Sequence, residues 1–455
     1  MTEAPQKVHG VWASRWTFIL AATGSAVGLG NIWKFPYITG EYGGGAFVLV
    51  YLFCIALVGV PIMVAEVLLG RRGRSSPINT MRRLVAEANM GRGWTGIGWL
   101  GVTAGFLILT FYSVIAGWAL YYAIESMQGN LLNITAETAS SSFDTLLANK
   151  NMLITYHSIF MLMVIGVVTC GVVKGLGVAV RVLMPLLFIL LLVLLGYGVQ
   201  EGNFPRAVDF LFGFDFSKLS GSAILVALGH AFFTLSLGMG AIMAYGAYMP
   251  EQAKVGQTVV TVAFLDTLIA LVAGLAIFPV VFAHPGIEPS AGPGLMFVSL
   301  PVAFGNMPGG LIFGTAFFVL VVLAAWSSAI SLIEPAVAWL VESRNFSRLG
   351  ASLLLGFTAW FIGLGTVLSF NAWAEFKVFF GMTFFDFLDY LTANIMLPLG
   401  GLFIAIFVGW IMKKENVMEE LKGTHDGLLN HWYKILRYVA PVLVALVFLN
   451  LVVGF

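Results

Sequence analysis

Long apolar runs dominate this sequence and constrain its fold more than any other feature. Apolar stretches of about 18 or more residues recur along the 455-residue chain, and each could cross a bilayer as a helix. Charged residues make up only 10% of the chain, well below the roughly 25% usual in a soluble domain. The sequence therefore predicts an all-α polytopic membrane protein that forms a single domain, one integrated helix bundle, over residues 1–455.

About eleven membrane spans can be placed on these runs. We expect them near residues 14–39, 44–70, 96–127, 152–173, 176–198, 222–249, 257–283, 310–341, 349–370, 383–412 and 434–454. Two connections, 128–151 and 199–220, are expected to be external, the first of them loop-like, and 284–309 should form a long structured outer loop. No signal-peptide cleavage site follows the first run, so we expect that run to remain.

Basic residues are distributed unevenly among the connections. With the N-terminus inside, 18 of the 23 lysines and arginines fall on cytoplasmic segments, and the others are Lys34, Lys150, Arg206, Lys218 and Lys377. Positively charged connections tend to stay on the cytoplasmic side of a membrane. We therefore expect a multi-pass protein of the cell inner (plasma) membrane, with its N-terminus in the cytoplasm and its C-terminus outside.

Two apolar segments are interrupted by small and polar residues. The first span contains the run from Gly24 to Asn31, and the sixth contains the run from His230 to Gly240. Glycine costs about 1 kcal/mol relative to alanine in a helix, and backbone freed in a bilayer must be buried in protein or line a cavity. Tight helix packing is the plainer explanation. Matched interruptions in two halves instead predict a 5+5 inverted repeat (1–198 and 222–412, followed by a last span at 434–454) with broken helices 1 and 6.

Motifs spread over the whole chain carry a family resemblance. They are Trp12-Ala13-Ser14-Arg15, the run from Gly24 to Asn31, Phe35-Pro36-Tyr37, the run from Glu41 to Phe47, the run from Phe232 to Gly238, and Ser327-Ser328. Together they resemble the sodium:neurotransmitter symporter family, in particular its bacterial leucine and hydrophobic amino-acid transporters. The resemblance implies the leucine-transporter fold and sodium-coupled symport of a neutral, hydrophobic amino acid by alternating access.

The resemblance also implies two sodium sites made of hard oxygen ligands. The first would use Ala26, Asn31, Thr234 and Asp266, completed by the carboxylate of the substrate. The second would use the carbonyls of Gly24, Val27 and Ala324 and the hydroxyls of Ser327 and Ser328. A carboxylate inside an apolar span is costly and functional by default, although a protonated Asp266 bonded to a hydroxyl is the alternative. Because this acid would replace the chloride of animal members, we expect no chloride requirement.

A substrate site of three parts follows from the same resemblance. The carboxylate would meet sodium, the N–H groups of Leu29 and Gly30, and the Tyr112 hydroxyl. The ammonium would be held near Ala26 by Phe233, Thr234 and Ser236. The side chain would lie among Ser25, Ile108, Met239, Ser328 and Leu332. Gly28 stands where amine-transporting relatives carry an aspartate, which argues for an amino acid.

Gates are implied at both ends. The outer gate would be the Lys34–Asp389 pair above a lid of Tyr112 and Phe233, and the inner gate would be Trp12 together with Glu342 and Tyr248. The usual inner arginine is replaced by His9, with Lys7 nearby, so the partner of Glu342 stays open, as does the role of Glu334. Glu66 matches a glutamate that satisfies the unwound sixth span. Gly175 and Pro185 resemble the pattern that lets the fifth helix unwind.

Other functions remain to be separated from this hypothesis. One is sodium-coupled symport of a non-protein solute such as taurine or a betaine-like osmolyte, and another is a sensor that binds an amino acid without cycling. An enzyme is not expected, since no metal-ligand cluster or nucleophile–base pair stands out. The expected partners are a small-molecule amino acid and the lipid bilayer, without nucleic acid, and the protein would be a monomer or homodimer.

Overall fold

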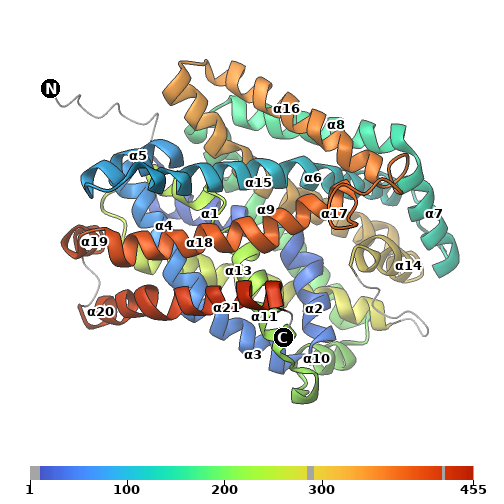
Figure 1. Ribbon diagram of the computed structural model, residues 1–455. Coiled ribbons are helices and arrows are strands. Elements are labelled where there is room, and N and C mark those ends of the chain that lie inside the picture. The colour runs from blue at the N-terminus through green and yellow to red at the C-terminus, as the bar shows by residue number, and fades with distance from the viewer. Residues whose placement is uncertain (1–10, 284–291, 423–425, 454–455) are drawn as a thin grey trace.

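Long helices form wherever the sequence carries a long apolar run. The computed structural model describes residues 11–283, 292–422 and 426–453, and within them eight helices are long and apolar enough to cross a bilayer (Figure 1). They are Gly45–Gly73 (α3 Gly45–Cys54, η2 Ile55–Gly59 and α4 Val60–Gly73), Arg92–Met127 (η3 Arg92–Thr95 and α6 Gly96–Met127), Lys150–Thr169 (α8), Val172–Glu201 (η4 Val172–Leu176 and α9 Gly177–Glu201), Val255–Phe282 (α13), Gly310–Arg344 (α15), Arg348–Ser369 (α16) and Phe384–Ile411 (α17 Phe384–Asp389, η7 Tyr390–Met396, α18 Leu397–Ile406 and η8 Phe407–Ile411).

The other three predicted spans consist of shorter pieces. The first is α1 Arg15–Ala26, η1 Gly30–Lys34 and α2 Phe35–Glu41; the sixth is α11 Gly221–Thr234 and α12 Ala241–Ala247; and the last is α20 Asp426–Lys434, η9 Ile435–Val439 and α21 Ala440–Val453. The first and sixth spans are thus broken at the two runs of small residues. The predicted fold class, with about eleven spans and broken helices 1 and 6, is confirmed, with ends that shift by a few residues.

Two connections hold more helix than the sequence suggested. The prediction that 128–151 is loop-like is wrong, because α7 (Ala136–Ala148) lies within it, started by the Thr135 hydroxyl accepting a hydrogen bond from Thr138 N at 3.2 Å. Within 199–220, α10 (Phe204–Phe212) buries Ala207 and Leu211. Such short helices depend on the surface they cover, which a local pattern does not reveal.

The outer connection at 284–309 is structured where the structure describes it. Residues 284–291 lie outside the described ranges, and the rest contains η6 (Leu295–Ser299) and α14 (Leu300–Gly305). The connections at the other end of the bundle contain α5 (Pro77–Glu87) and α19 (Lys414–Glu420). A short turn, η5 (Phe216–Lys218), belongs to the connection 199–220 and precedes α11.

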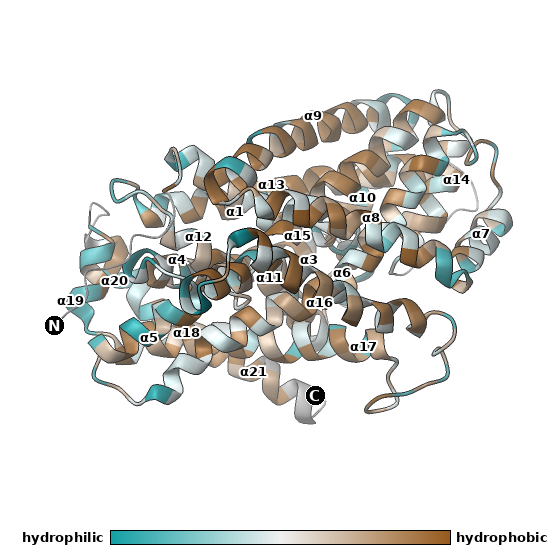
Figure 2. Cartoon of the chain, turned by 90° about the horizontal axis from the view of Figure 1, so that it is seen from above, coloured by the Kyte–Doolittle hydropathy of each residue, from teal (hydrophilic) through white to brown (hydrophobic). Residues whose placement is uncertain are grey.

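The bundle has two polar ends and an apolar belt. Figure 1 shows α5, α19 and α20 at one end and α7 and α14 at the other. Figure 2 shows α9 and α13 hydrophobic along most of their lengths, whereas hydrophilic residues gather around α19, α20 and α7. Large apolar side chains on the outside of the bundle, such as Val182 (59% exposed) and Phe357 (61% exposed), would be unfavourable in water but suit contact with lipid.

The broken first span lies inside the bundle rather than at its edge. Helix α1 packs against α9, α13 and α15, and most of its residues from Thr17 to Ala26 are buried. The chain break at the end of α1 is therefore enclosed by protein, as unpaired backbone in a bilayer requires.

Candidate functional site

The first break frees backbone carbonyls that a neighbouring helix then satisfies. Helix α1 ends at Ala26, and Val27 is extended with φ −74° and ψ 102°. The Ser328 hydroxyl, from α15, lies 3.3, 3.2 and 3.1 Å from the carbonyl oxygens of Gly24, Ser25 and Val27. Three of the five groups expected at the second sodium site, the carbonyls of Gly24 and Val27 and this hydroxyl, therefore meet at one point.

The rest of the second predicted sodium set also lies on α15, where Ser327 directly precedes Ser328 and Ala324 lies about one turn before it. The buried Ser327 hydroxyl donates to the Ala324 carbonyl at 3.0 Å, and a Cβ on Gly24 would lie 3.4 Å from Ser327 Cβ. All five groups are uncharged oxygens in a buried place, which is the ligand type that a hard cation prefers. The donor set fits Na⁺.

The second break is shaped by residues with positive φ. Helix α11 ends at Thr234 and α12 begins at Ala241, and between them Ser236, Gly238 and Gly240 have φ of 54°, 73° and 75°. A Cβ on Gly238 would lie 2.5 Å from the Leu397 carbonyl oxygen, so only glycine fits there.

Glu66 meets the freed backbone of this second break. Its side chain is buried on α4, and the Gly238 N–H donates to its Oε2 at 3.1 Å. This contact agrees with the structural role expected for the glutamate, since an unpaired N–H at this depth would be costly.

Three polar side chains form a compact cluster where the first sodium site was predicted. Asn31 Nδ2 donates to Asp266 Oδ1 at 2.7 Å and to the Thr234 hydroxyl at 3.0 Å, and that hydroxyl lies 2.9 and 3.1 Å from the two carboxylate oxygens. All three residues are buried, from η1, α11 and α13. A carboxylate and a hydroxyl converge here, and such oxygen ligands suit a hard cation, whereas Asn31 Oδ1 accepts a hydrogen bond from Gly28 N at 3.1 Å.

Serine hydroxyls join the two breaks directly. The Ser25 hydroxyl donates to Ser331 Oγ at 2.8 Å and lies 3.2 Å from Ser236 Oγ, and the Ser236 hydroxyl donates to the Ser25 carbonyl at 3.0 Å. Ser331 was missed by the sequence analysis. Its spacing of three residues from Ser328, which places both on one face of α15, is the signal that could have found it.

The space beside Gly28 is filled by two hydroxyl oxygens. A Cβ on Gly28 would lie 2.8 Å from both Ser328 Oγ and Tyr112 Oη. The Leu29 N–H donates to Tyr112 Oη at 3.3 Å, so the tyrosine of α6 already contacts the start of the second half-helix. The predicted carboxylate-binding groups are thus adjacent.

Apolar residues close the other side of this region. Ile108, Met239 and Leu332 are 1%, 3% and 4% exposed. They come from α6, the second break and α15. A Cβ on Gly105 would lie 2.9 Å from the Met239 carbonyl and 3.2 Å from that of Leu332, so α6 packs its bare backbone against both. Gly105 was not singled out from the sequence.

A cavity of about 320 Å³ leads to the first break from the side of α7 and α14. It is lined by residues that include Leu29, Gly30, Lys34, Tyr112, Phe233 and Asp389. Lys34 Nζ lies 5.5 Å from the centre of the Phe233 ring. Lys34 and Asp389 line the same cavity, but they are not among the ion pairs of the described residues.

The opposite end of the site is closed by Trp12. This side chain is 2% exposed, its Nε1 donates to the Tyr245 carbonyl at 3.0 Å, and its backbone N–H donates to the Tyr248 carbonyl at 2.9 Å. Its ring contacts both tyrosine rings edge-on, at 5.5 and 6.1 Å. The start of the first span is therefore fastened to the end of α12.

Glu342 and Glu334 have different partners. Glu342 accepts hydrogen bonds from Ser76 N at 2.9 and 3.0 Å and from Asn79 Nδ2 at 3.0 Å, at the start of α5, where a carboxylate is favoured. His9 and Lys7 lie outside the described residues. Glu334 is buried and pairs with Arg348 through both carboxylate oxygens, with Nη1–Oε1 at 3.1 Å.

The structure also differs from the sequence analysis around Tyr248. We expected its hydroxyl to support Glu342, but it makes a long contact of 3.5 Å with Glu334 Oε1 instead. Arg348, which the sequence analysis did not select, donates from Nε to the Val168 carbonyl at 2.9 Å and so ties α15 and α16 to the end of α8. The predicted helix-unwinding segment follows directly, as η4 and then α9 with Pro185 inside it.

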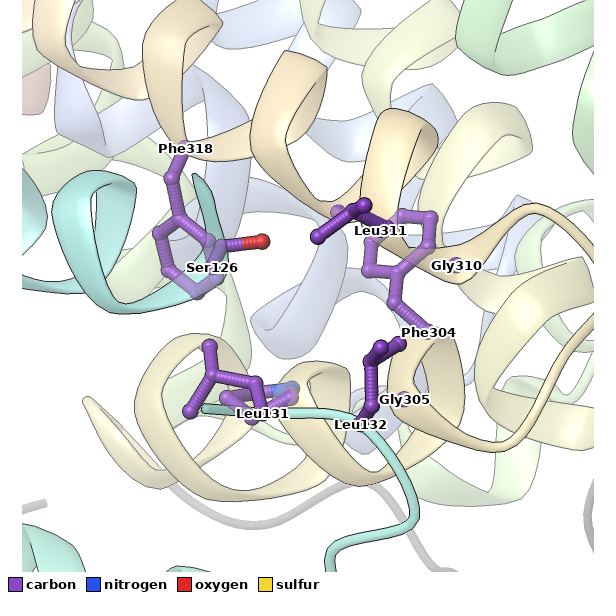
Figure 3. Close-up of a pocket in the computed structure, with 10 residues that line it drawn as sticks. Ser126, Leu131, Leu132, Phe304, Gly305, Gly310, Leu311 and Phe318 are labelled. Atoms are coloured by element: carbon purple, nitrogen blue, oxygen red, sulfur yellow. The ribbon is translucent and has the colours of Figure 1, made fainter. Parts of the chain in front are cut away.

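A second, much smaller cavity lies apart from this site. It occupies about 10 Å³ between α6, α14 and α15. Figure 3 shows Ser126, Leu131, Phe304, Leu311 and Phe318 around it. It has room for no more than one water-sized group, so it is no candidate for a substrate site.

Comparison of this chain with known proteins shows which family it resembles. A model of the sodium:neurotransmitter symporter family matches residues 9–140 and 147–455. The uncharacterized sodium-dependent transporter YhdH of Bacillus subtilis is 35% identical over 444 residues, 97% of each chain. A sodium- and chloride-dependent taurine transporter of Canis lupus familiaris is 25% identical over 486 residues, covering 95% of this chain and 76% of that one. The crystal structure of MhsT in complex with L-phenylalanine is 43% identical, with a TM-score of 0.90 over 97% of this chain and 99% of that one.

The family match covers nearly the whole chain, and two of the motifs that suggested it form the two breaks. This chain belongs to the sodium:neurotransmitter symporter family, and it is a sodium-dependent, multi-pass membrane transporter rather than an enzyme.

Proposed function

We propose that this transporter carries a neutral, hydrophobic amino acid into the cell together with Na⁺, by alternating access and without a requirement for chloride. The observation that carries the proposal is the packing around Gly28, where a Cβ would lie 2.8 Å from Ser328 Oγ and Tyr112 Oη. No acidic side chain can stand there to replace a missing substrate carboxylate. The substrate therefore brings its own carboxylate, as an amino acid does.

The contacts of that carboxylate follow from the neighbouring groups. The Leu29 and Gly30 N–H groups open the second half of the broken first span, where the positive end of a helix dipole favours an anion. Tyr112 Oη is 3.3 Å from Leu29 N and can turn its proton toward a carboxylate. The ammonium group would lie near Ala26, Phe233, Thr234 and Ser236.

The substrate side chain would enter the apolar part of the site. Ile108, Met239 and Leu332 are buried there, beside Ser25 and Ser328. A solute without an apolar side chain, such as taurine, would leave these surfaces without a partner. The L-phenylalanine complex of the 43% identical MhsT supports an aromatic or large aliphatic side chain.

Two sodium ions would bind at the two oxygen clusters. The first would contact Ala26, Asn31, Thr234 and Asp266 next to the substrate carboxylate. The second would contact Gly24, Val27, Ala324, Ser327 and Ser328 at the junction of α1 and α15. The buried charge of Asp266 would replace the chloride that the taurine relative needs according to its name.

The proposed transport cycle starts from the arrangement seen here. Trp12 closes the α5 side, which the distribution of basic residues assigns to the cytoplasm of a plasma membrane. The 320 Å³ cavity reaches the first break from the other side, past Lys34 and Asp389. A substrate would thus enter from outside, between Tyr112 and Phe233.

Uptake into proteoliposomes tests the proposal. With an inward sodium gradient, L-[³H]phenylalanine should accumulate equally in chloride and in gluconate, and collapse of the gradient with an ionophore should abolish accumulation. Excess leucine should compete and excess taurine should not. Equal uptake when potassium replaces sodium would refute sodium coupling. Competition by taurine and not by leucine would favour the osmolyte alternative. Binding of phenylalanine without uptake would favour the sensor.

A further inference from the structure

A long groove opens on the outer surface of the bundle, away from the substrate site. It encloses about 740 Å³ between the second span, α13 and the segment formed by α20 and η9, and the start of α1 also lines it. Its walls include Val60, Val64 and Val260, the last of which is 54% exposed. The groove therefore faces the lipid and belongs to no part of the transport pathway described above.

One wall of the groove is apolar and runs along the second span. From Val64 back to Ala56 its wall follows the second span for eight residues, which at 1.5 Å per residue is about 12 Å. Trp432 closes the wall by donating from Nε1 to the Pro61 carbonyl at 3.3 Å. These dimensions suit one acyl chain lying along the helix.

Polar side chains gather at one end of the groove. Arg15 is the first residue of α1, Gln257 the third of α13, and His431 the sixth of α20, and all three line the groove. Arg15 Nε donates to the Thr258 hydroxyl at 3.0 Å, which holds the guanidinium at this polar end, the mouth of the groove. His431 places this end at α20, which Figure 1 shows at the same end of the bundle as α19.

The charge around this mouth is one-sided. Lys254 and Lys434 are exposed next to lining residues, and neither of them, nor Arg15, makes an ion pair within the described ranges. The nearby Glu420 is engaged by Arg71 at 2.8 Å. Among the described residues, no aspartate or glutamate lines the groove. The mouth therefore offers cations to an anion at the membrane surface.

We propose that this groove binds one anionic phospholipid of the leaflet on the α20 side, with its phosphate at Arg15 and one acyl chain along Val60, Val64 and Val260. Basic pockets between transmembrane helices recognise anionic headgroups in this way. A zwitterionic lipid would carry a quaternary ammonium toward the same cations and bind less well. The lipid would fasten the start of α1 to α13 and α20.

Native mass spectrometry of the purified full-length protein tests the groove without any transport assay. The protein would be titrated with phosphatidylglycerol or with phosphatidylcholine of the same acyl chains. We expect at least fivefold stronger retention of phosphatidylglycerol, because each cation near the surface contributes about a factor of five. sn-Glycerol 3-phosphate should not compete, since it has no acyl chain.

Two variants and one control locate the site. Arg15→Gln should lower phosphatidylglycerol retention about fivefold, and Val260→Trp, which fills the groove from an exposed position, at least tenfold. Leu100→Trp is the control, because Leu100 lines a separate groove of about 610 Å³ that has no charged lining residue. Circular dichroism and gel filtration would establish that the variants fold. Equal retention of the two lipids, unchanged retention in Val260→Trp, or competition by the glycerol phosphate would overturn the proposal.

Discussion

Removing the charge of Asp266 tests the proposed link between the first sodium site and chloride independence. In Asp266→Asn the shape is preserved, but the group that accepts from Asn31 Nδ2 at 2.7 Å and from the Thr234 hydroxyl at 2.9 Å becomes neutral. These bonds exist with or without the ion, so the term that changes sodium affinity is the attraction between carboxylate and cation. Two unit charges about 4 Å apart attract by about 4 kcal/mol at an effective dielectric constant of about 20. Losing half of that, about 2 kcal/mol, already weakens sodium binding roughly thirtyfold.

The assay compares uptake of L-[³H]phenylalanine at a series of sodium concentrations, in chloride and in gluconate. We expect Asp266→Asn to need at least thirtyfold more sodium in gluconate and to recover part of its affinity in chloride, because an added anion would restore the missing charge. Asp386→Asn, on the exposed start of α17, is the matched control and should behave like the unmodified protein. The reasoning fails if Asp266→Asn keeps its sodium dependence in gluconate, or if the unmodified protein itself requires chloride.

Three further substitutions test other parts of the structure. Gly28→Ala should abolish sodium-dependent phenylalanine binding in a scintillation proximity assay, since its Cβ would lie 2.8 Å from two hydroxyl oxygens; unchanged affinity would argue against a tight site there. Arg348→Gln leaves the buried Glu334 unpaired and should lower the free energy of unfolding by about 3 kcal/mol, measured as a lower melting temperature. Adding Glu334→Gln to this variant should largely restore the melting temperature of the unmodified protein. Trp12→Ala removes the bond to the Tyr245 carbonyl and should speed labelling of a cysteine placed in the cytoplasmic pathway; equal labelling rates would contradict its role as a plug.

The spans and the breaks could be predicted from the sequence because both have local causes. A long apolar run is sufficient for a membrane helix, and a cluster of glycines such as Gly238 and Gly240 favours a backbone with positive φ and so a break in the helix. Helix α7 could not be predicted in the same way. Its stability depends on burying Ala139 and Leu146 against the rest of the outer region, a surface that exists only after the chain folds.

The same division applies to the candidate site. Asp266 could be selected because a carboxylate is rare in an apolar segment, whereas Asn31 and Thr234 were assigned to the same site by the family resemblance, and the structure does bring the three together. Arg348 could not be selected, because nothing local says that its partner is the buried Glu334. Sequence identifies costly residues, whereas the partner that offsets the cost is a property of the packed fold.

The contact between α1 and α15 suggests how sodium binding could be coupled to movement of the first span. The Ser328 hydroxyl lies within 3.3 Å of the carbonyl oxygens of Gly24, Ser25 and Val27, yet it has one proton and can satisfy only one of them at a time. A cation at the proposed second site would attract the Gly24 and Val27 carbonyls and the hydroxyl oxygen together. We infer that sodium holds α1 against α15 more firmly than the serine does alone. When the ion leaves, the remaining hydroxyl bond, worth about 1 kcal/mol, opposes the displacement of α1 that opening toward the Trp12 side requires.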